Sequence, residues 1–201
     1  MAVKIPLSRF IDFVGARTQD AREKKVREIK RQLDEEEYKP YSDPYKPLRE
    51  AIQAAGGKKL DKPFPTAERV NLPSLAKKWN AFVGARVFSS YSPASGEWSH
   101  GSLIIKVNPD IALREEGEDN VRHLKIYFKK NPPDKRQSKL LYQLKLETLR
   151  LERNDMGILA LRRSGYGDRM IIPIHNGVGS SNVAKMLRRE AEFFARIWQD
   201  V

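Results

Sequence analysis

The chain has 201 residues, of which 40% are hydrophobic and 32% charged, and it contains no cysteine. This composition is typical of a globular protein with one sizeable core, and it excludes disulfide scaffolds, zinc–cysteine sites, iron–sulfur clusters and thiol catalysis. The 38 Lys and Arg residues outnumber the 26 Asp and Glu residues, for a net charge of +12. Residues 121–201 hold 17 of these bases against 8 acids, so we expect this part of the fold to attract polyanions such as nucleic acid.

Residues 1–60 are predicted to form a helical N-terminal extension. Apolar residues recur at helical spacing within residues 9–16 and again from residue 20, and a third helix is expected to end at Gly56. The stretch from Lys58 to Leu72 is rich in Lys and Pro without periodicity, which predicts a linker over residues 61–72. Neither a leader peptide nor an 18-residue apolar stretch is recognisable, so we expect a cytoplasmic protein with no membrane partner.

Residues 73–201 are predicted to form a mixed-sheet α/β domain. The pattern indicates, in order, a helix 73–84, strands 86–91, 102–115 and 121–129, a helix 134–151, strands 157–163 and 170–174, and a final helix from Ser180 or Ser181. A kink is expected at Asn108-Pro109. Strands joined by short turns are antiparallel, and a strand after a long helix can rejoin the sheet through a right-handed crossover. The expected fold class is therefore α/β (α+β), with a mixed β-sheet flanked by helices.

The third strand of this domain has a clear alternation of side chains. One face is apolar, with Leu124, Ile126 and Phe128, and the other carries His123, Lys125, Tyr127 and Lys129. Aligning the apolar faces pairs Leu113 with Leu124 and Ile111 with Ile126 across a loop at 117–120. We therefore expect Asp110 to be a diagonal neighbour of Lys125 on a solvent-facing side of the sheet.

Two triplets on these strands resemble those of a nuclease family. Asn108-Pro109-Asp110 and His123-Leu124-Lys125, with the order helix, three strands, helix, strand over residues 73–163, resemble the restriction-endonuclease-like PD-(D/E)XK core. The resemblance implies that Asp110 ligates a metal ion, that Lys125 positions the attacking water or stabilises the developing phosphorane charge, and that His123 acts as a metal ligand or general base.

This sequence departs from the family pattern at the first residue of the second triplet, which is His123 in place of an acid. Mg²⁺ prefers oxygen ligands, whereas one carboxylate and one imidazole suit Mn²⁺ or Zn²⁺ better. We therefore expect a nuclease-like core that is catalytically impaired, with Mg²⁺ or Mn²⁺ as its cofactor if it is active. The segments VNPDIAL and HLKIYFKK also resemble bacterial proteins without an assigned activity.

A basic and aromatic cluster is predicted where the third strand leads into the following helix. Its members are Lys129, Lys130, Lys135, Arg136, Lys139, Tyr127 and Tyr142. Such side chains neutralise phosphates and stack on bases, which predicts nucleic-acid binding, with DNA favoured over RNA. The alternative is an adaptor or structural subunit of a multiprotein assembly, in bacterial defence or a mobile element, which binds a protein partner through its N-terminal helices.

Overall fold

The computed structural model describes residues 2–36, 43–61, 63–64, 71–162 and 167–201. The strands are β1 (Val3–Pro6), β2 (Phe88–Tyr91), β3 (Gly96–His100), β4 (Leu103–Val107), β5 (Ile111–Glu115), β6 (Arg122–Tyr127) and β7 (Met156–Ala160). The helices are α1 (Leu7–Gly15), α2 (Gln19–Glu36), α3 (Lys46–Ala55), α4 (Leu72–Val83), α5 (Lys135–Leu149) and α6 (Ser181–Asp200), with the short 3-10 helices η1 (Arg153–Asp155) and η2 (Gly167–Met170).

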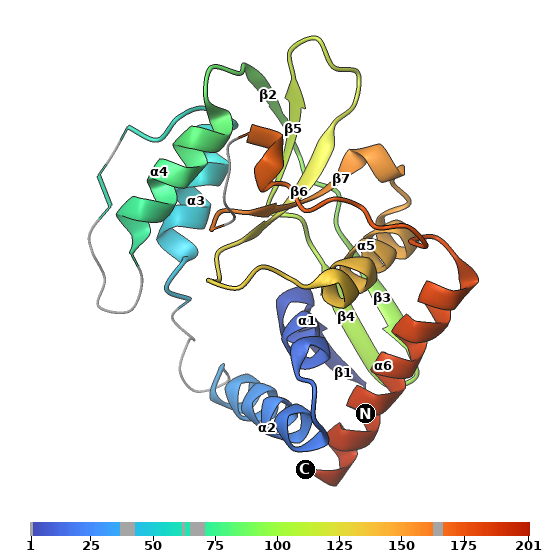
Figure 1. The fold of residues 1–201 in the computed structure, drawn as a ribbon. Helices are drawn as coiled ribbons and strands as arrows, with labels where there is room; N and C mark the ends of the chain where they lie inside the picture. The colour runs from blue at the N-terminus through green and yellow to red at the C-terminus, as the bar shows by residue number, and fades with distance from the viewer. Residues whose placement is uncertain (1, 37–42, 62, 65–70, 163–166) are drawn as a thin grey trace.

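A bent hairpin connects two sheets (Figure 1). The half of the hairpin next to its turn, β3 and β4, forms a sheet with β1 in the order β1-β4-β3. The half farther from the turn, β2 and β5, belongs to the sheet β2-β5-β6-β7. The bend between β4 and β5 falls at Asn108-Pro109, as the sequence predicts, because proline has no N–H with which to continue the ladder. After α5, β7 returns to the sheet parallel to β6, as expected for a strand that follows a long helix.

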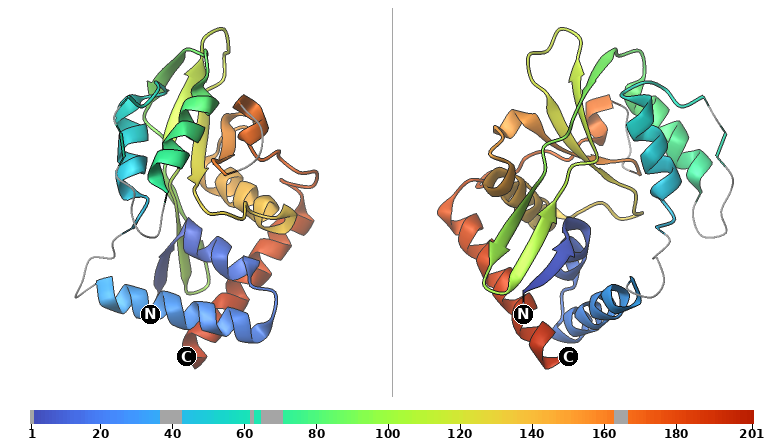
Figure 2. Two further views of the ribbon diagram at one scale, coloured as in Figure 1. Left: turned by 60° about the vertical axis from the view of Figure 1, so that its left-hand side comes forward. Right: turned by 180° about the vertical axis from the view of Figure 1, so that it is seen from behind.

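Helices cover both faces of the four-stranded sheet (Figure 2). Leu113, Leu124 and Ile126 form one apolar cluster with α3 and α4. On the opposite face, Met156 and Ile158 belong to a second cluster that includes residues of α1, α5 and α6. The mixed sheets flanked by helices confirm the expected α/β class at this coarse level.

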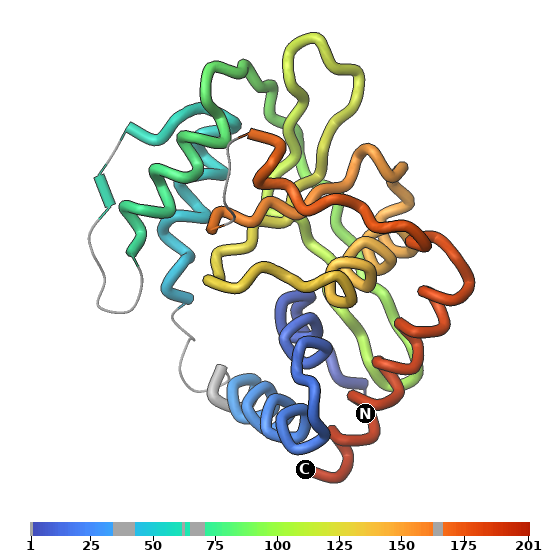
Figure 3. Tube along the Cα trace, viewed as in Figure 1, coloured from blue at the N-terminus to red at the C-terminus, as the bar shows by residue number. Residues whose placement is uncertain are grey.

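The first 60 residues are not only helical, because β1 pairs in parallel with β4. They also supply buried residues to both clusters: Phe10 and Phe13 belong to the cluster that includes α5 and α6, whereas Leu48 and Ile52 pack with α4. In the tube of Figure 3, β1 and the end of α6 lie at the same end of the molecule. Within the expected linker 61–72, residues 62 and 65–70 lie outside the described residues, and α4 begins at Leu72.

Two further differences concern strands. The pattern did not predict β3, in which Trp98 is the only large apolar residue of Gly96–His100. The predicted strand at 170–174 is wrong, because Met170 ends η2, Ile171 forms an isolated bridge to Leu159, and residues 172–174 have no regular secondary structure. None of the helices in the described ranges combines the length and the apolar character that a membrane crossing requires.

Candidate functional site

The hairpin of β5 and β6 is shifted by two residues from the expected register. Ile111 pairs with Leu124 and Leu113 with Arg122, so the predicted pairs Leu113–Leu124 and Ile111–Ile126 are wrong. A shift of two residues keeps every side chain on its own face, so hydrophobic patterning does not distinguish the two registers. The observed register encloses eight residues, 114–121, between the paired Leu113 and Arg122, two fewer than the expected pairing of Leu113 with Leu124 would enclose.

Asp110 nevertheless meets Lys125, as the sequence predicts. Lys125 Nζ lies 3.0 Å from Asp110 Oδ1, and the backbone N–H of Ile126 donates to Oδ2 over 2.7 Å. Arg49 of α3 brings its Nε to 3.3 Å from Oδ1, and Gln53 donates to the Asp110 carbonyl oxygen over 2.9 Å. Asp110 is only 6% exposed, so both carboxylate oxygens are occupied by protein donors in a nearly closed environment.

The expected solvent-facing row on β6 is therefore half-buried. The Lys125 side chain is 22% exposed, and it also donates to the carbonyl oxygen of Asn108 over 3.2 Å. The face of the sheet that carries Lys125 is covered by α5 rather than by water, because Tyr127 of the same face packs against the apolar cluster that includes α5, and α5 contacts β7. The arrangement holds the carboxylate and the ammonium together but leaves little space for a substrate beside them.

His123 faces a different set of groups from those around Asp110. Its Nδ1 accepts a hydrogen bond from the Ala94 backbone N–H at 3.0 Å. Burial lowers the pKa of His123, the charge of Lys145 lowers it further, and Asp155 opposes both effects. Because Nδ1 accepts this hydrogen bond, the proton of the neutral imidazole lies on Nε2.

The metal site implied for Asp110 and His123 gains no further ligands from the fold. Across the described ranges, no three or more His, Asp or Glu side chains gather as a group able to hold a metal ion. A divalent cation at Asp110 would also have to displace Lys125 or the N–H of Ile126 from its oxygens. The catalytic and metal-binding roles of Asp110, His123 and Lys125 remain predictions.

Lys145 is an ionisable residue of this region that the sequence analysis did not identify. It lies on the buried side of α5 with no exposed surface, and its ammonium donates to the carbonyl oxygens of His123 at 2.6 Å and Gly157 at 2.9 Å. Burial lowers its pKa to about 7, Lys125 contributes in the same direction, and Asp110 opposes. The available signal was its helical spacing, four residues after the buried Leu141.

The predicted basic and aromatic cluster is only partly brought together. Tyr142 is fully buried and its hydroxyl donates to the Ile172 carbonyl oxygen at 2.5 Å, so the expectation that it stacks on bases is wrong. Tyr127 packs against the apolar cluster of α5 and α6, and burial, with Asp12 and Tyr45 nearby, raises its pKa to about 12. Lys129 forms an ion pair with Asp12 of α1 and is thereby tied to the fold.

The remaining bases of that cluster are accessible. Lys130 and Lys135 are exposed, and Lys139 is half-buried beside the turn before α6, where its ammonium lies near Gly177. Arg136 keeps 45% of its side chain exposed while it pairs with Glu190 of α6. Arg136 thus reaches α6 itself, and Lys139 reaches the turn before it.

A groove lies between these two helices, and we call it the α5–α6 groove. Its lining residues are Arg136, Asn182, Lys185, Met186, Arg189 and Glu190. Three of them are cations and one is an acid, and the acid is already engaged, because Glu190 pairs with Arg136 and lies 3.2 Å from Arg22. Within the described residues, no ion pair involves the exposed Lys185 or Arg189. The groove therefore presents uncompensated positive charge to solvent.

Sequence reasoning missed Lys185 and Arg189 because it placed the basic and aromatic cluster only where β6 leads into α5. The apolar stripe of α6 packs into the core, with Leu187 and Phe194 buried. The two bases are four residues apart, so they project from the opposite face of the same helix. That spacing was the signal that could have identified them.

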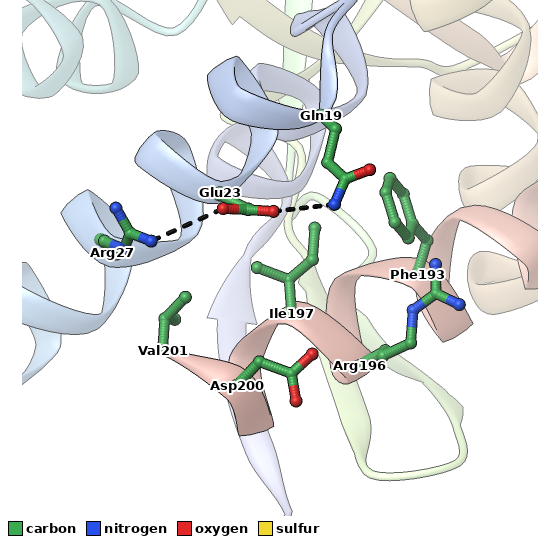
Figure 4. Close-up of a pocket in the computed structure, with 8 residues that line it drawn as sticks. All are labelled: Gln19, Glu23, Arg27, Phe193, Arg196, Ile197, Asp200 and Val201. Atoms are coloured by element: carbon green, nitrogen blue, oxygen red, sulfur yellow. Dashed lines mark hydrogen bonds and ion pairs between the residues drawn. The ribbon is translucent and has the colours of Figure 1, made fainter.

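A second pocket lies between α2 and the C-terminal half of α6 (Figure 4). Its lining includes two acids, Glu23 and Asp200, and two bases, Arg27 and Arg196. Glu23 accepts from Gln19 at 2.9 Å and lies 3.5 Å from Arg27. Because its charges balance, this pocket has less attraction for a polyanion than the α5–α6 groove.

Comparison with models of protein families, with curated proteins and with solved structures finds no match for this chain.

Proposed function

We propose that the protein binds nucleic acid through the α5–α6 groove and does not cleave it. The observation that carries the proposal is the pairing pattern of the groove. Arg136, Lys185 and Arg189 face solvent around a single acid, Glu190, whose charge is already neutralised by arginine. Surface cations without protein partners bind phosphates by releasing condensed counterions.

The surroundings of the groove favour the same ligand. Lys139 and Lys135 extend its positive charge along α5, and the N-terminal end of α6 carries the positive end of the helix dipole next to Asn182 and Lys185. The sequence prediction that the C-terminal part contacts phosphates is retained for Lys130, Lys135, Arg136 and Lys139. It is extended here to Lys185 and Arg189.

The core is proposed to be nuclease-like but not active. The order α4, β2–β3, β4–β5, β6, α5, β7 has the same sequence of elements as the resemblance implies, and Asp110 and Lys125 of its two motifs are in contact. Cleavage would require Asp110 to hold Mg²⁺ or Mn²⁺ and direct a water molecule. Its oxygens instead accept from Lys125, Ile126 and the nearby Arg49, which supports a structural role.

The test is a binding titration with fluorescent duplex and single-stranded DNA and RNA at low salt. The double variant Lys185→Glu/Arg189→Glu is expected to weaken binding at least roughly tenfold, because it reverses two charges that face phosphates. The matched control is Lys59→Glu/Lys77→Glu, which makes the same charge change at exposed positions next to α3 and on α4. The control is expected to lose much less affinity.

Equal losses in the two variants would show that only net charge matters and would overturn the groove as the site. A wild-type protein with no affinity for any of the four ligands would favour the adaptor function instead. Cleavage in the presence of Mn²⁺ that is lost in Asp110→Ala would contradict the inactive core.

A further inference from the structure

The four edge strands of the two sheets differ in how they are protected. Natural edges are blocked by charges, proline or a covering segment, because an open edge pairs with other chains. In the three-stranded sheet, β1 carries Lys4 and Pro6, and β3 carries Glu97 and His100. In the four-stranded sheet, the segment of Ile171 and Ile172 covers β7. Ile171 forms a bridge to Leu159, and the backbone N–H of Ile172 donates to the Ile158 carbonyl oxygen at 2.9 Å.

The remaining edge, β2, has none of these protections among the residues that the structure describes. Its sequence, Phe-Ser-Ser-Tyr, contains no charge and no proline, and its last three residues are exposed. The large hydrophobic residues that are exposed in the described chain are Val87, at 61%, and Tyr91, at 37%. They lie immediately before β2 and at its end.

The pairing of β2 with β5 leaves hydrogen-bonding groups on the outer side of β2. Glu116 donates its backbone N–H to the Val87 carbonyl oxygen, and Ser89 pairs with Arg114 in the same register. Because hydrogen-bonded pairs alternate in an antiparallel ladder, the N–H and C=O groups of Phe88 and Ser90 point away from β5. The Phe88 and Ser90 side chains face the end of α3 near Gly57 and Gly56, so this contact covers a face of β2 and not its edge.

We infer that β2 is a docking edge for a second copy of this chain, joined antiparallel about a two-fold axis at Ser89. This register makes Phe88 and the partner's Ser90 a hydrogen-bonded pair, and it uses every outward group identified above. It also places Val87 opposite the partner's Tyr91 in a non-hydrogen-bonded pair, where side chains approach most closely. The edge is therefore complementary to itself in both hydrogen bonding and apolar contact, which favours a second copy over an unrelated chain.

Sedimentation velocity over roughly 1 to 100 μM chain tests this inference. The expected mass rises with concentration from 23.1 kDa towards twice that value. Ser89→Lys places like charges opposite each other at the axis and is expected to raise the dissociation constant at least roughly tenfold. Ser99→Lys is the matched control, because it makes the same change at an exposed position of β3, and it is expected to have no effect.

A mixture of Ser89→Lys and Ser89→Glu is expected to form a dimer that neither variant forms alone, since opposite charges then meet at the axis. Hydrogen exchange on the wild type adds a measurement without substitution: the amides of Phe88 and Ser90 are expected to become protected as concentration rises. A wild type that stays monomeric, or a mixture that does not associate, overturns the inference. Both outcomes leave the proposed nucleic-acid binding untouched.

Discussion

Lys125 Nζ lies 3.0 Å from Asp110 Oδ1, at a carboxylate that is only 6% exposed. The contact joins β6 to the bend that precedes β5, and the approach of Arg49 adds α3 to it. A buried charge pair of this kind is costly to break from one side, because the remaining charge is left uncompensated. Through Arg49, this charge cluster holds α3, in the N-terminal part of the chain, against the sheet.

Asp110→Ala is therefore expected to reduce the free energy of unfolding by about 3 kcal/mol, since it removes the acceptor of the buried Ile126 N–H and the carboxylate that faces two cations. Lys125 would then keep only the Asn108 carbonyl oxygen, and Arg49 would keep Asp43. Asp110→Asn keeps one acceptor for Ile126 and is expected to cost less. Urea denaturation at neutral pH measures both. Unchanged stability of Asp110→Ala would show that Asp110 is not the structural anchor described here.

Lys145 is expected to make stability depend on pH. Its pKa is about 7 in the folded protein and 10.5 as the ordinary value, so between these limits the unfolded chain binds more protons and stability rises with pH. From pH 7 to pH 9 the rise attributable to this group is about 2 kcal/mol. Lys145→Met, which has no charge to bury, is expected to lose that rise.

The comparison requires the free energy of unfolding of the wild type and of Lys145→Met at several pH values between 7 and 9. The difference between the two curves isolates Lys145 from the other titrating groups. Parallel curves would mean that the ammonium is not held at a lowered pKa.

The overall class of the fold and the meeting of Asp110 with Lys125 could be predicted, because both follow from patterns within neighbouring segments. The alternation of β6 and the proline bend before Asp110 were sufficient for them. The register of β5 and β6 could not be predicted, since a shift of two residues leaves Ile111 and Leu124 on the same faces of their strands.

Contacts between distant segments had no signal in the sequence. Arg49 and Asp110 are 61 residues apart, and β1 pairs with β4 across about half the chain. The bases of α6 were missed for another reason: the basic cluster was expected only where β6 leads into α5, although Lys185 and Arg189 line the groove between α5 and α6.

Tyr142→Phe separates a structural tyrosine from a base-stacking one. The hydroxyl donates to the Ile172 carbonyl oxygen inside the core, so its loss is expected to cost about 1 kcal/mol of stability. Nucleic-acid affinity is expected to stay the same, as a binding titration beside thermal denaturation would show. A loss of affinity at unchanged stability would show instead that Tyr142 contributes to nucleic-acid binding.

Lys129 and Lys135 provide a matched pair of substitutions to alanine. Lys129 is engaged by Asp12, whereas Lys135 is exposed beside the α5–α6 groove. Lys129→Ala is expected to cost at most about 1 kcal/mol of stability and to affect binding less than Lys135→Ala does. Titrations of both variants with one duplex compare their losses of affinity. A larger loss in Lys129→Ala than in Lys135→Ala would indicate that the interface lies nearer to α1.

The salt dependence of binding tests the central claim most directly. Plotting the logarithm of the association constant against the logarithm of salt concentration gives a slope of about −0.9 for each phosphate that the protein neutralises on duplex DNA. For Lys185→Ala/Arg189→Ala the account predicts a slope shallower than that of the wild type by about 2, because two phosphate contacts are removed. Parallel lines for the two proteins would contradict nucleic-acid binding in the α5–α6 groove.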